Sequence, residues 1–81
     1  MATFTKLQGQ YLAFIDAYRK VNGRAPAEAD MQRYFEVTAP VVHQMVMTLH
    51  RNGLVSRSPG AARSLRVAIP QEEIPRLELR A

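Results

Sequence analysis

Apolar residues recur every three or four positions early in the chain, which is the spacing of one face of an α-helix. Thr5 is a suitable N-cap for this segment, and Asn22 with Gly23 is a suitable stop. The apolar stripe consists of Leu7, Tyr11, Leu12, Ile15 and Tyr18. The pattern predicts a first helix over residues 5–21, in which Gly9 leaves room for the close approach of another segment.

A shorter helix is predicted over residues 27–35, because Pro26 favours an extended residue before it and a helix start after it. The apolar face of this helix consists of Met31, Tyr34 and Phe35. Ala27 stands where a serine or threonine would cap the helix, so its start is weakly capped. Asp30 nevertheless suits the positive end of the helix dipole.

The third predicted helix, residues 39–52, has very little charge. Thr38 is expected to cap this helix and Asn52 to end it. Its inward positions are Val42, Val46 and Leu49, with Met45 at the border. Its outward positions are Pro40, Gln44, Met47, Thr48 and Arg51, flanked by Val41 and His43. Because Arg51 is the only formal charge between Thr38 and Asn52, the outer face is polar but almost uncharged.

The hydrophobic period changes to two after Gly53, which is typical of β-strands. Residues 54–58 and 63–69 are predicted to pair as strands across a turn at Pro59 to Ala62. The second strand places Leu65, Val67 and Ile69 on one face and Arg66 on the other. The result is a β-hairpin over residues 54–69 with arginines on its exposed side.

The remaining residues, 70–81, contain two prolines and no helical stripe. We therefore divide the chain into a domain over residues 1–69 and an extended C-terminal tail over residues 70–81. The tail carries Ile74, Leu77 and Leu79, which either dock on another surface, form a dimer contact or belong to a flexible segment.

Three helices and a hairpin give a mainly α fold with a small β-hairpin. The second and third helices are separated only by a tight turn at Glu36 and Val37. This order of elements is the plan of a winged helix-turn-helix, in which the third helix enters the DNA major groove and the hairpin is the wing.

Length and composition exclude several classes of protein. With 81 residues and no cysteine, the chain supports one small domain without disulfides or cysteine-based zinc sites. His43 and His50 alone cannot form a metal site, so neither a metal nor another cofactor is expected. No apolar run approaches the roughly 20 residues of a membrane span, and the N-terminus does not resemble a signal peptide. We expect a cytoplasmic protein of bacterial type, associated with the nucleoid.

Charge is distributed unevenly along the chain. Residues 37–71 contain no acidic residue and four arginines, which are Arg51, Arg57, Arg63 and Arg66. A polyanion is the natural partner of such a block, although a solvated basic surface gives the same pattern. The acidic residues of the two predicted N-terminal helices lie in no predicted cleft, so neither an enzyme nor a small-molecule substrate is expected.

The outer face of the third helix has side chains suited to base edges. Gln44 can pair bidentately with adenine, and Val41 and Thr48 can pack on thymine methyl groups. His43 can contact a base edge or a phosphate. The four arginines are candidates for phosphate contacts, with the wing tip at residues 59–62 entering or skirting the minor groove. Double-stranded DNA is therefore the predicted partner.

Three segments together resemble the DNA-binding domain of the LexA repressor family. They are FTKLQGQYLAFI, GRAPAEADMQRYFEV and VVHQMVMTLHRNGLVSRSPGAARSLRV, which stand in the family's order and cover about residues 4–69. The resemblance implies sequence-specific DNA binding by a small repressor-like regulator. It also implies base contacts from Thr38, Ala39, Val41, His43 and Gln44.

The chain departs from the family pattern at several positions. Ala27 replaces the helix cap, and Glu36 replaces the glycine common in the turn. Ala39 and Val41 stand where polar DNA-contacting residues are common, so the operator is expected to differ from the family's usual one. Residues 70–81 hold neither an Ala-Gly cleavage site nor a Ser/Lys pair, so self-cleavage is not expected of this chain.

Two further hypotheses concern partners. The winged-helix plan is also used for protein–protein contacts, and the apolar residues Ala39, Val41 and Met47 on the exposed face favour that alternative. One copy would contact about one half-site, so a symmetric homodimer on two half-sites is a second hypothesis.

Overall fold

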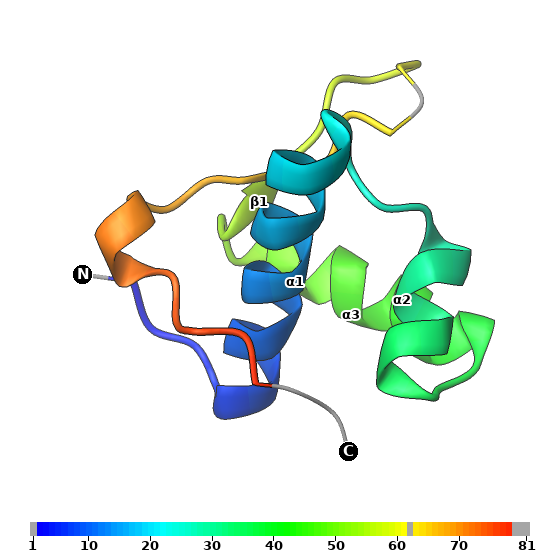
Figure 1. Ribbon diagram of the computed structural model, residues 1–81, viewed down its shortest axis with the longest axis horizontal. Helices are drawn as coiled ribbons and strands as arrows, with labels where there is room; N and C mark the ends of the chain where they lie inside the picture. The colour runs from blue at the N-terminus through cyan, green and yellow to red at the C-terminus, as the bar shows by residue number, and fades with distance from the viewer. Residues whose placement is uncertain (1, 62, 79–81) are drawn as a thin grey trace.

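Helices dominate residues 2–61 and 63–78, which are the residues that the computed structural model describes (Figure 1). The elements are α1 (Lys6–Asn22), α2 (Glu28–Phe35), α3 (Ala39–Arg51), β1 (Val55–Ser56), β2 (Arg66–Val67) and the 3-10 helix η1 (Gln71–Glu73). The two strands pair antiparallel, with Val55 opposite Val67 and Ser56 opposite Arg66. The predicted fold class, three helices followed by a small hairpin in the winged helix-turn-helix order, is confirmed. None of the helices in the described ranges combines the length and apolarity needed to cross a membrane.

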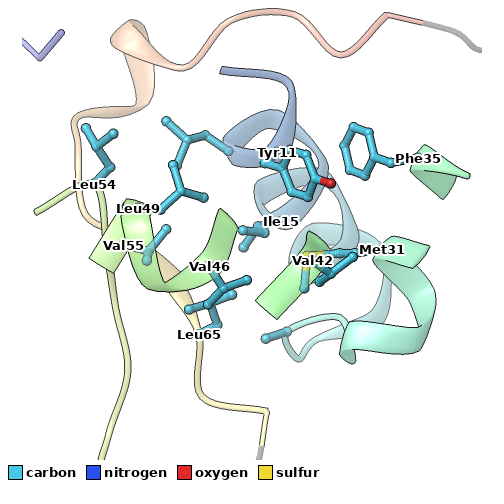
Figure 2. Packing of buried hydrophobic residues seen from close by; sticks show 12 residues of the cluster. Tyr11, Ile15, Met31, Phe35, Val42, Val46, Leu49, Leu54, Val55 and Leu65 are labelled. Carbon is cyan, nitrogen blue, oxygen red and sulfur yellow. The ribbon is translucent and has the colours of Figure 1, made fainter. Parts of the chain in front are cut away.

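The core lies where the three helices meet the hairpin (Figure 2). Its largest fully buried side chains are Tyr11, Leu12, Ile15, Met31, Leu49 and Val42. The ring of Tyr11 stacks on that of Phe35, with centroids 3.9 Å apart, and so joins α1 to α2. Val42, Val46 and Leu49 are buried as predicted and Met45 is half-buried, so the opposite face of α3 remains open to solvent.

The first helix is capped as predicted but buries a different side of its first turn. Thr5 Oγ1 accepts the Gln8 N–H, and Gln8 Oε1 accepts the Thr5 N–H in return. Leu7, expected in the core, is 54% exposed. The buried residue of this turn is Gly9, because Phe4 and Pro75 lie over that side. A Cβ at residue 9 would lie 2.9 Å from atoms of both, so the predicted close approach at Gly9 is confirmed.

Neither α2 nor α3 has a hydrogen bond from an N-cap side chain at its start. Ala27 makes no side-chain cap bond, but its N–H donates to Asp30 Oδ2 at 2.8 Å. Thr38 was expected to cap α3 and makes no such bond. Pro40 in the second helical position removes one of the two N–H groups that an N-cap side chain serves, and Thr38 does not bond the other, that of Val41.

Glu36 closes α2 in the left-handed conformation, with φ 56. Its N–H donates to Gln32 O, as a C-cap glycine would. A glutamate there is strained relative to glycine, yet the turn that sets α2 against α3 still forms.

The strands are shorter than the predicted 54–58 and 63–69. Beyond Ser56 the Ser58 N–H donates to Ser64 Oγ at 2.9 Å, a side chain rather than the opposite backbone. Arg63 also has a positive φ of 53, which turns the chain out of the ladder. On the other side, the Ala68 N–H donates to Leu54 O at 2.8 Å and closes the hairpin. The wing is therefore a short ladder that carries a long loop.

The C-terminal residues are neither fully extended nor detached. After η1, residues 74–78, here called the C-terminal strap, run back along α1 (Figure 1). Gln10 bonds the backbone of the strap twice, at Arg76 O and at the Glu78 N–H, and the Tyr34 hydroxyl donates to Glu78 O at 2.6 Å. Ile74 and Leu77 of the strap are half-buried against the rest of the protein. Leu79 lies outside the described residues.

Candidate nucleic-acid interface

The exposed side of α3 carries most of the residues predicted to read bases. Val41 is 49% exposed and Met47 39% exposed, and neither is covered by another element. An open hollow of about 490 Å³ lies along this side, lined by Gln8, Pro40, Val41, Gln44, Met45 and Thr48. The structure thus brings together Val41, Gln44 and Thr48, three of the predicted residues, and adds Gln8 of α1 to them.

The remaining predicted base contacts lie at the start of α3. Thr38 and Ala39 are exposed at the N-terminal end of the helix and are not part of the lining of the hollow. His43 is exposed on a different side, where its Nδ1 lies 3.3 Å from Oε2 of Glu28 in α2. That contact is an ion pair only when the imidazole is protonated. His43 is therefore tied to α2 rather than gathered with Gln44.

Two basic groups border the other end of α3. Arg51, in its last turn, donates from Nη2 to Thr48 Oγ1 at 3.4 Å, which places a guanidinium beside the half-buried hydroxyl of Thr48. Arg57 is exposed and shares a second hollow with His50 and wing residues 58–61. The sequence pattern does not predict a role for His50 at this border, although its position next to Arg51 at the end of the helix is a signal for one.

Arg63 is turned toward α2, although it also lines one hollow together with Arg57. Its side chain is 31% exposed, and its Nη2 donates to Asp30 Oδ2 at 3.2 Å. Asp30 also accepts from the Ala27 N–H and from Arg33. The Ala27 hydrogen bond, with the guanidinium groups of Arg33 and Arg63, holds the pKa of Asp30 below its ordinary value. Arg63 therefore anchors the wing to α2, which the sequence pattern did not predict.

Arg66 lies apart from the other predicted phosphate contacts. It is exposed on β2 and lines a hollow with Asp16, Arg19 and Lys20 of α1. Lys20 is paired with Asp16 at 2.9 Å, and Arg19 donates to Leu65 O at 3.3 Å. Arg66 thus belongs to a basic surface on the α1 side of the hairpin, and the four arginines do not form one cluster.

No group of three or more metal-ligating side chains lies close enough to hold an ion among residues 2–61 and 63–78. The arrangement offers instead an uncharged helix face with Arg51 and Arg57 at one end and Glu28 of α2 beside His43 at its flank. Such a face can form hydrogen bonds and apolar contacts with a surface that presents both, while the two arginines attract anions.

Comparison with known proteins relates this surface to one family. The family model described as LexA DNA binding domain matches residues 1–64. The chain is 32% identical over 74 residues to the LexA repressor of Thermosipho melanesiensis, covering 91% of this chain and 37% of that protein. It is 32% identical over 65 residues to that of Thermosipho africanus, covering 80% and 33%. It is 34% identical over 58 residues to that of Petrotoga mobilis, covering 70% and 28%.

The chain spans about a third of the length of these curated relatives. The similarity therefore concerns one part of each relative. Because the family model covers most of the present sequence, this chain belongs to the LexA DNA-binding domain family.

Proposed function

We propose that this chain binds double-stranded DNA sequence-specifically, as the DNA-reading part of a repressor-like transcription regulator. The observation that carries the proposal is the exposed, uncharged outer face of α3 with Arg51 and Arg57 at its border. Membership of the LexA DNA-binding domain family supports it, as do relatives named LexA repressor. A regulator rather than an enzyme follows from the same family.

In this proposal α3 lies in the major groove, which admits a helix of ordinary diameter. Gln44 is the principal hydrogen-bonding group, because its amide can donate to adenine N7 and accept from adenine N6. Val41 and Thr48 lie beside it on the same hollow. Thr38 and Ala39 contact the edge of the site from the helix start, and His43 does so only when it leaves Glu28.

The phosphate contacts are assigned by position. Arg51 and Arg57 lie at the C-terminal end of α3 and contact the phosphate backbone at that end of the groove, with His50 beside Arg57. Arg66 contacts phosphate only where the DNA reaches the α1 side of the hairpin. Arg63 keeps the wing in place through Asp30 and contributes little directly.

A symmetric homodimer on two half-sites remains part of the proposal, since one α3 covers only a short stretch of DNA. Ile74 and Leu77 are half-buried within the chain, so the dimer contact is better sought elsewhere than in the strap. We also propose that residues 1–69 form the DNA-binding unit, with the strap as an intramolecular support. A regulator of this kind would act on the bacterial nucleoid in the cytoplasm.

The second candidate function is a winged-helix protein-docking module. The exposed side chains of Val41 and Met47 favour it, because apolar groups on an open helix face also suit a protein surface. The absence of acidic residues from 37–71 favours DNA instead.

Selection from a randomised duplex library distinguishes the two functions. The whole 81-residue chain is incubated with the library, bound duplexes are recovered, and the cycle is repeated. Enrichment of one motif supports the proposed function. A library that stays random after several cycles, with the folded state verified by circular dichroism, contradicts it.

A further inference from the structure

A hollow of about 330 Å³, here called the α1–β2 hollow, lies between the second half of α1 and the segment that runs from β2 to η1 (Figure 1). Val67 and Ile69 give its lining an apolar part, and both are half-buried. Its charged lining consists of three cations and one carboxylate, which are Arg19, Lys20, Arg66 and Asp16. The α1–β2 hollow shares no lining residue with the hollow of α3, so the two surfaces use different side chains.

Arg66 is the cation of the α1–β2 hollow that lacks a partner within the described part of the chain. Lys20 pairs with Asp16 at 2.9 Å, and Gln71 Nε2 donates to the same carboxylate at 3.2 Å. Arg19 donates to a backbone carbonyl of the hairpin at 3.3 Å. Arg66 is exposed and makes no hydrogen bond or ion pair among residues 2–61 and 63–78. Its guanidinium is therefore available to a carboxylate of another molecule.

A carboxylate without a partner lies on the same surface. Glu72 is exposed in η1 and directly follows Gln71, which lines the α1–β2 hollow. Its neighbour Glu73 accepts the Ala2 N–H at 2.7 Å, whereas Glu72 is unpaired as far as the described ranges extend. One surface of the protein thus presents an available cation, an available carboxylate and half-buried apolar side chains.

We propose that this surface is a self-association surface, on which a second copy of this chain docks across a two-fold axis. A symmetric dimer uses the same patch on both copies, so a patch that carries both signs of charge complements itself. Arg66 of each copy then faces Glu72 of the other, and Val67 and Ile69 are covered by their symmetry mates. The inference rests on the proposed function, in which a homodimer occupies two half-sites, and it names the surface of that homodimer.

DNA is a poorer match for this surface than a second copy. Phosphate groups are repelled by the Glu72 carboxylate and have no apolar group to offer Val67 and Ile69. A second copy supplies both signs of charge and apolar groups in an arrangement that symmetry fixes. An unrelated protein would have to reproduce that arrangement independently. The observations therefore favour a second copy of this chain as the occupant.

The contact is expected to be weak in the free protein. Exposed ion pairs add little to affinity because solvent screens them, so the apolar side chains supply most of the attraction. A weak contact is sufficient on DNA, because two molecules held next to each other meet at an effective concentration of the order of 1 mM. Self-association should therefore be measurable when the free protein approaches that concentration.

Charge reversal at the two positions tests the contact without DNA. Sedimentation velocity of the whole chain at rising concentration should show a monomer that converts to a dimer. Arg66→Glu and Glu72→Arg should each lower the association constant by about tenfold or more, because like charges then face each other twice across the axis. Arg24→Glu is the matched control, since Arg24 is an exposed arginine between α1 and α2 that does not line the α1–β2 hollow. This control should associate like the wild type.

An equimolar mixture of the two variants separates a specific contact from misfolding. A dimer of one Arg66→Glu copy and one Glu72→Arg copy has opposite charges at both of its contacts. Mixing should therefore restore association to nearly the wild-type level, although each variant alone stays largely monomeric. The double variant, which carries both substitutions, should also associate like the wild type.

The outcomes distinguish this inference from the proposed function. Loss of association in each variant and its recovery in the mixture would support the inference. A wild-type chain that stays monomeric up to about 1 mM would overturn it. Association unchanged in both variants, or not recovered on mixing, would overturn the pairing of Arg66 with Glu72. A monomeric chain that still enriches a DNA motif would leave the proposed function intact, whereas a chain that dimerises and enriches none would overturn the proposed function alone.

Discussion

Arg63 of the wing and Asp30 of α2 are joined by an ion pair, with Arg63 Nη2 lying 3.2 Å from Asp30 Oδ2. The two residues are 33 positions apart in the chain and largely covered, with side-chain exposures of 31% and 15%. Asp30 also supports the start of α2 through the Ala27 N–H. One carboxylate therefore links the placement of the wing to that of the helix-turn-helix.

This linkage predicts the phenotype of Arg63→Ala. The variant should unfold at a lower temperature than the wild type. It loses the ion pair with Asp30 that helps to hold residue 63 in its left-handed conformation. We expect its DNA binding to weaken with no change in the salt slope, since the Arg63 guanidinium is paired with Asp30 in the structure. Thermal denaturation and a salt titration measure the two effects. A salt slope reduced by about 0.9 would instead restore Arg63 as a phosphate contact.

Asp30 should make the stability of the folded protein depend on pH in the acidic range. Its pKa is lowered in the folded state from an ordinary value of 3.8. The ionised carboxylate therefore makes its full contribution to the free energy of unfolding above that value. The contribution is then lost as the pH falls through the lowered folded-state pKa. Asp30→Asn should therefore lower the melting temperature at neutral pH and differ much less from the wild type near pH 3. An equal difference between the two proteins at both pH values would contradict this account.

Arg57→Ala tests the assigned phosphate contact on the wing. Because Arg57 is exposed beside His50, the variant should bind all duplex sequences more weakly and lower the salt slope by about 0.9 per lost contact. The matched control is Arg76→Ala, an exposed arginine of the strap that lines neither hollow of α3. Identical salt slopes in the wild type and Arg57→Ala would remove Arg57 from the interface.

Gln44→Ala should affect sequence preference rather than general affinity. Loss of the amide should reduce discrimination between the enriched motif and single-base variants by about 1–3 kcal/mol at one position. Competition binding with a set of variant duplexes measures this preference. Gln71→Ala, a change on η1 outside the hollow of α3, serves as the control. An unchanged ranking of duplexes in Gln44→Ala would exclude Gln44 from base recognition.

Gly9→Ala should destabilise the protein, against the usual effect of replacing a helical glycine. An alanine is normally favoured there by up to about 1 kcal/mol, whereas overpacking costs about 1–3 kcal/mol. The new Cβ would lie 2.9 Å from Phe4 Cε1 and Pro75 Cγ. Thermal denaturation should show a lower melting temperature, partly recovered by adding Pro75→Ala. A higher melting temperature for Gly9→Ala would mean that the strap does not pack against α1.

Local patterns predicted the features that depend on neighbours in the sequence. The hydrophobic periodicity predicted the three helices. It also predicted the buried side of α3, which consists of Val42, Val46 and Leu49. It misplaced Leu7, because the cover of the first turn comes from Pro75, which is distant in sequence. The expected Thr38 cap is absent, and the proline two residues later, which removes one of its two possible N–H partners, is visible in the sequence.

Long-range contacts were beyond these patterns. The strap is held by Tyr34 and Gln10, which lie 44 and 68 positions from Glu78, and nothing in residues 70–81 alone indicates those partners. The ion pair of Arg63 could not be predicted for the same reason, because its partner Asp30 lies 33 positions away, and the phosphate contact of Arg63 stays a prediction. The roles of Gln44, Val41 and Arg57 remain predictions that binding experiments test.

The most direct test of DNA recognition by α3 is a salt titration with two duplexes, one carrying the enriched motif and one scrambled. The account predicts that both bind at ~50 mM salt, that both affinities fall by ~0.9 log units per log unit of salt for each neutralised phosphate, and that the motif binds more tightly throughout. Failure of the folded chain to bind either duplex at ~50 mM salt would contradict the account. Equal affinity for the two duplexes would leave charge attraction alone and contradict recognition of sequence.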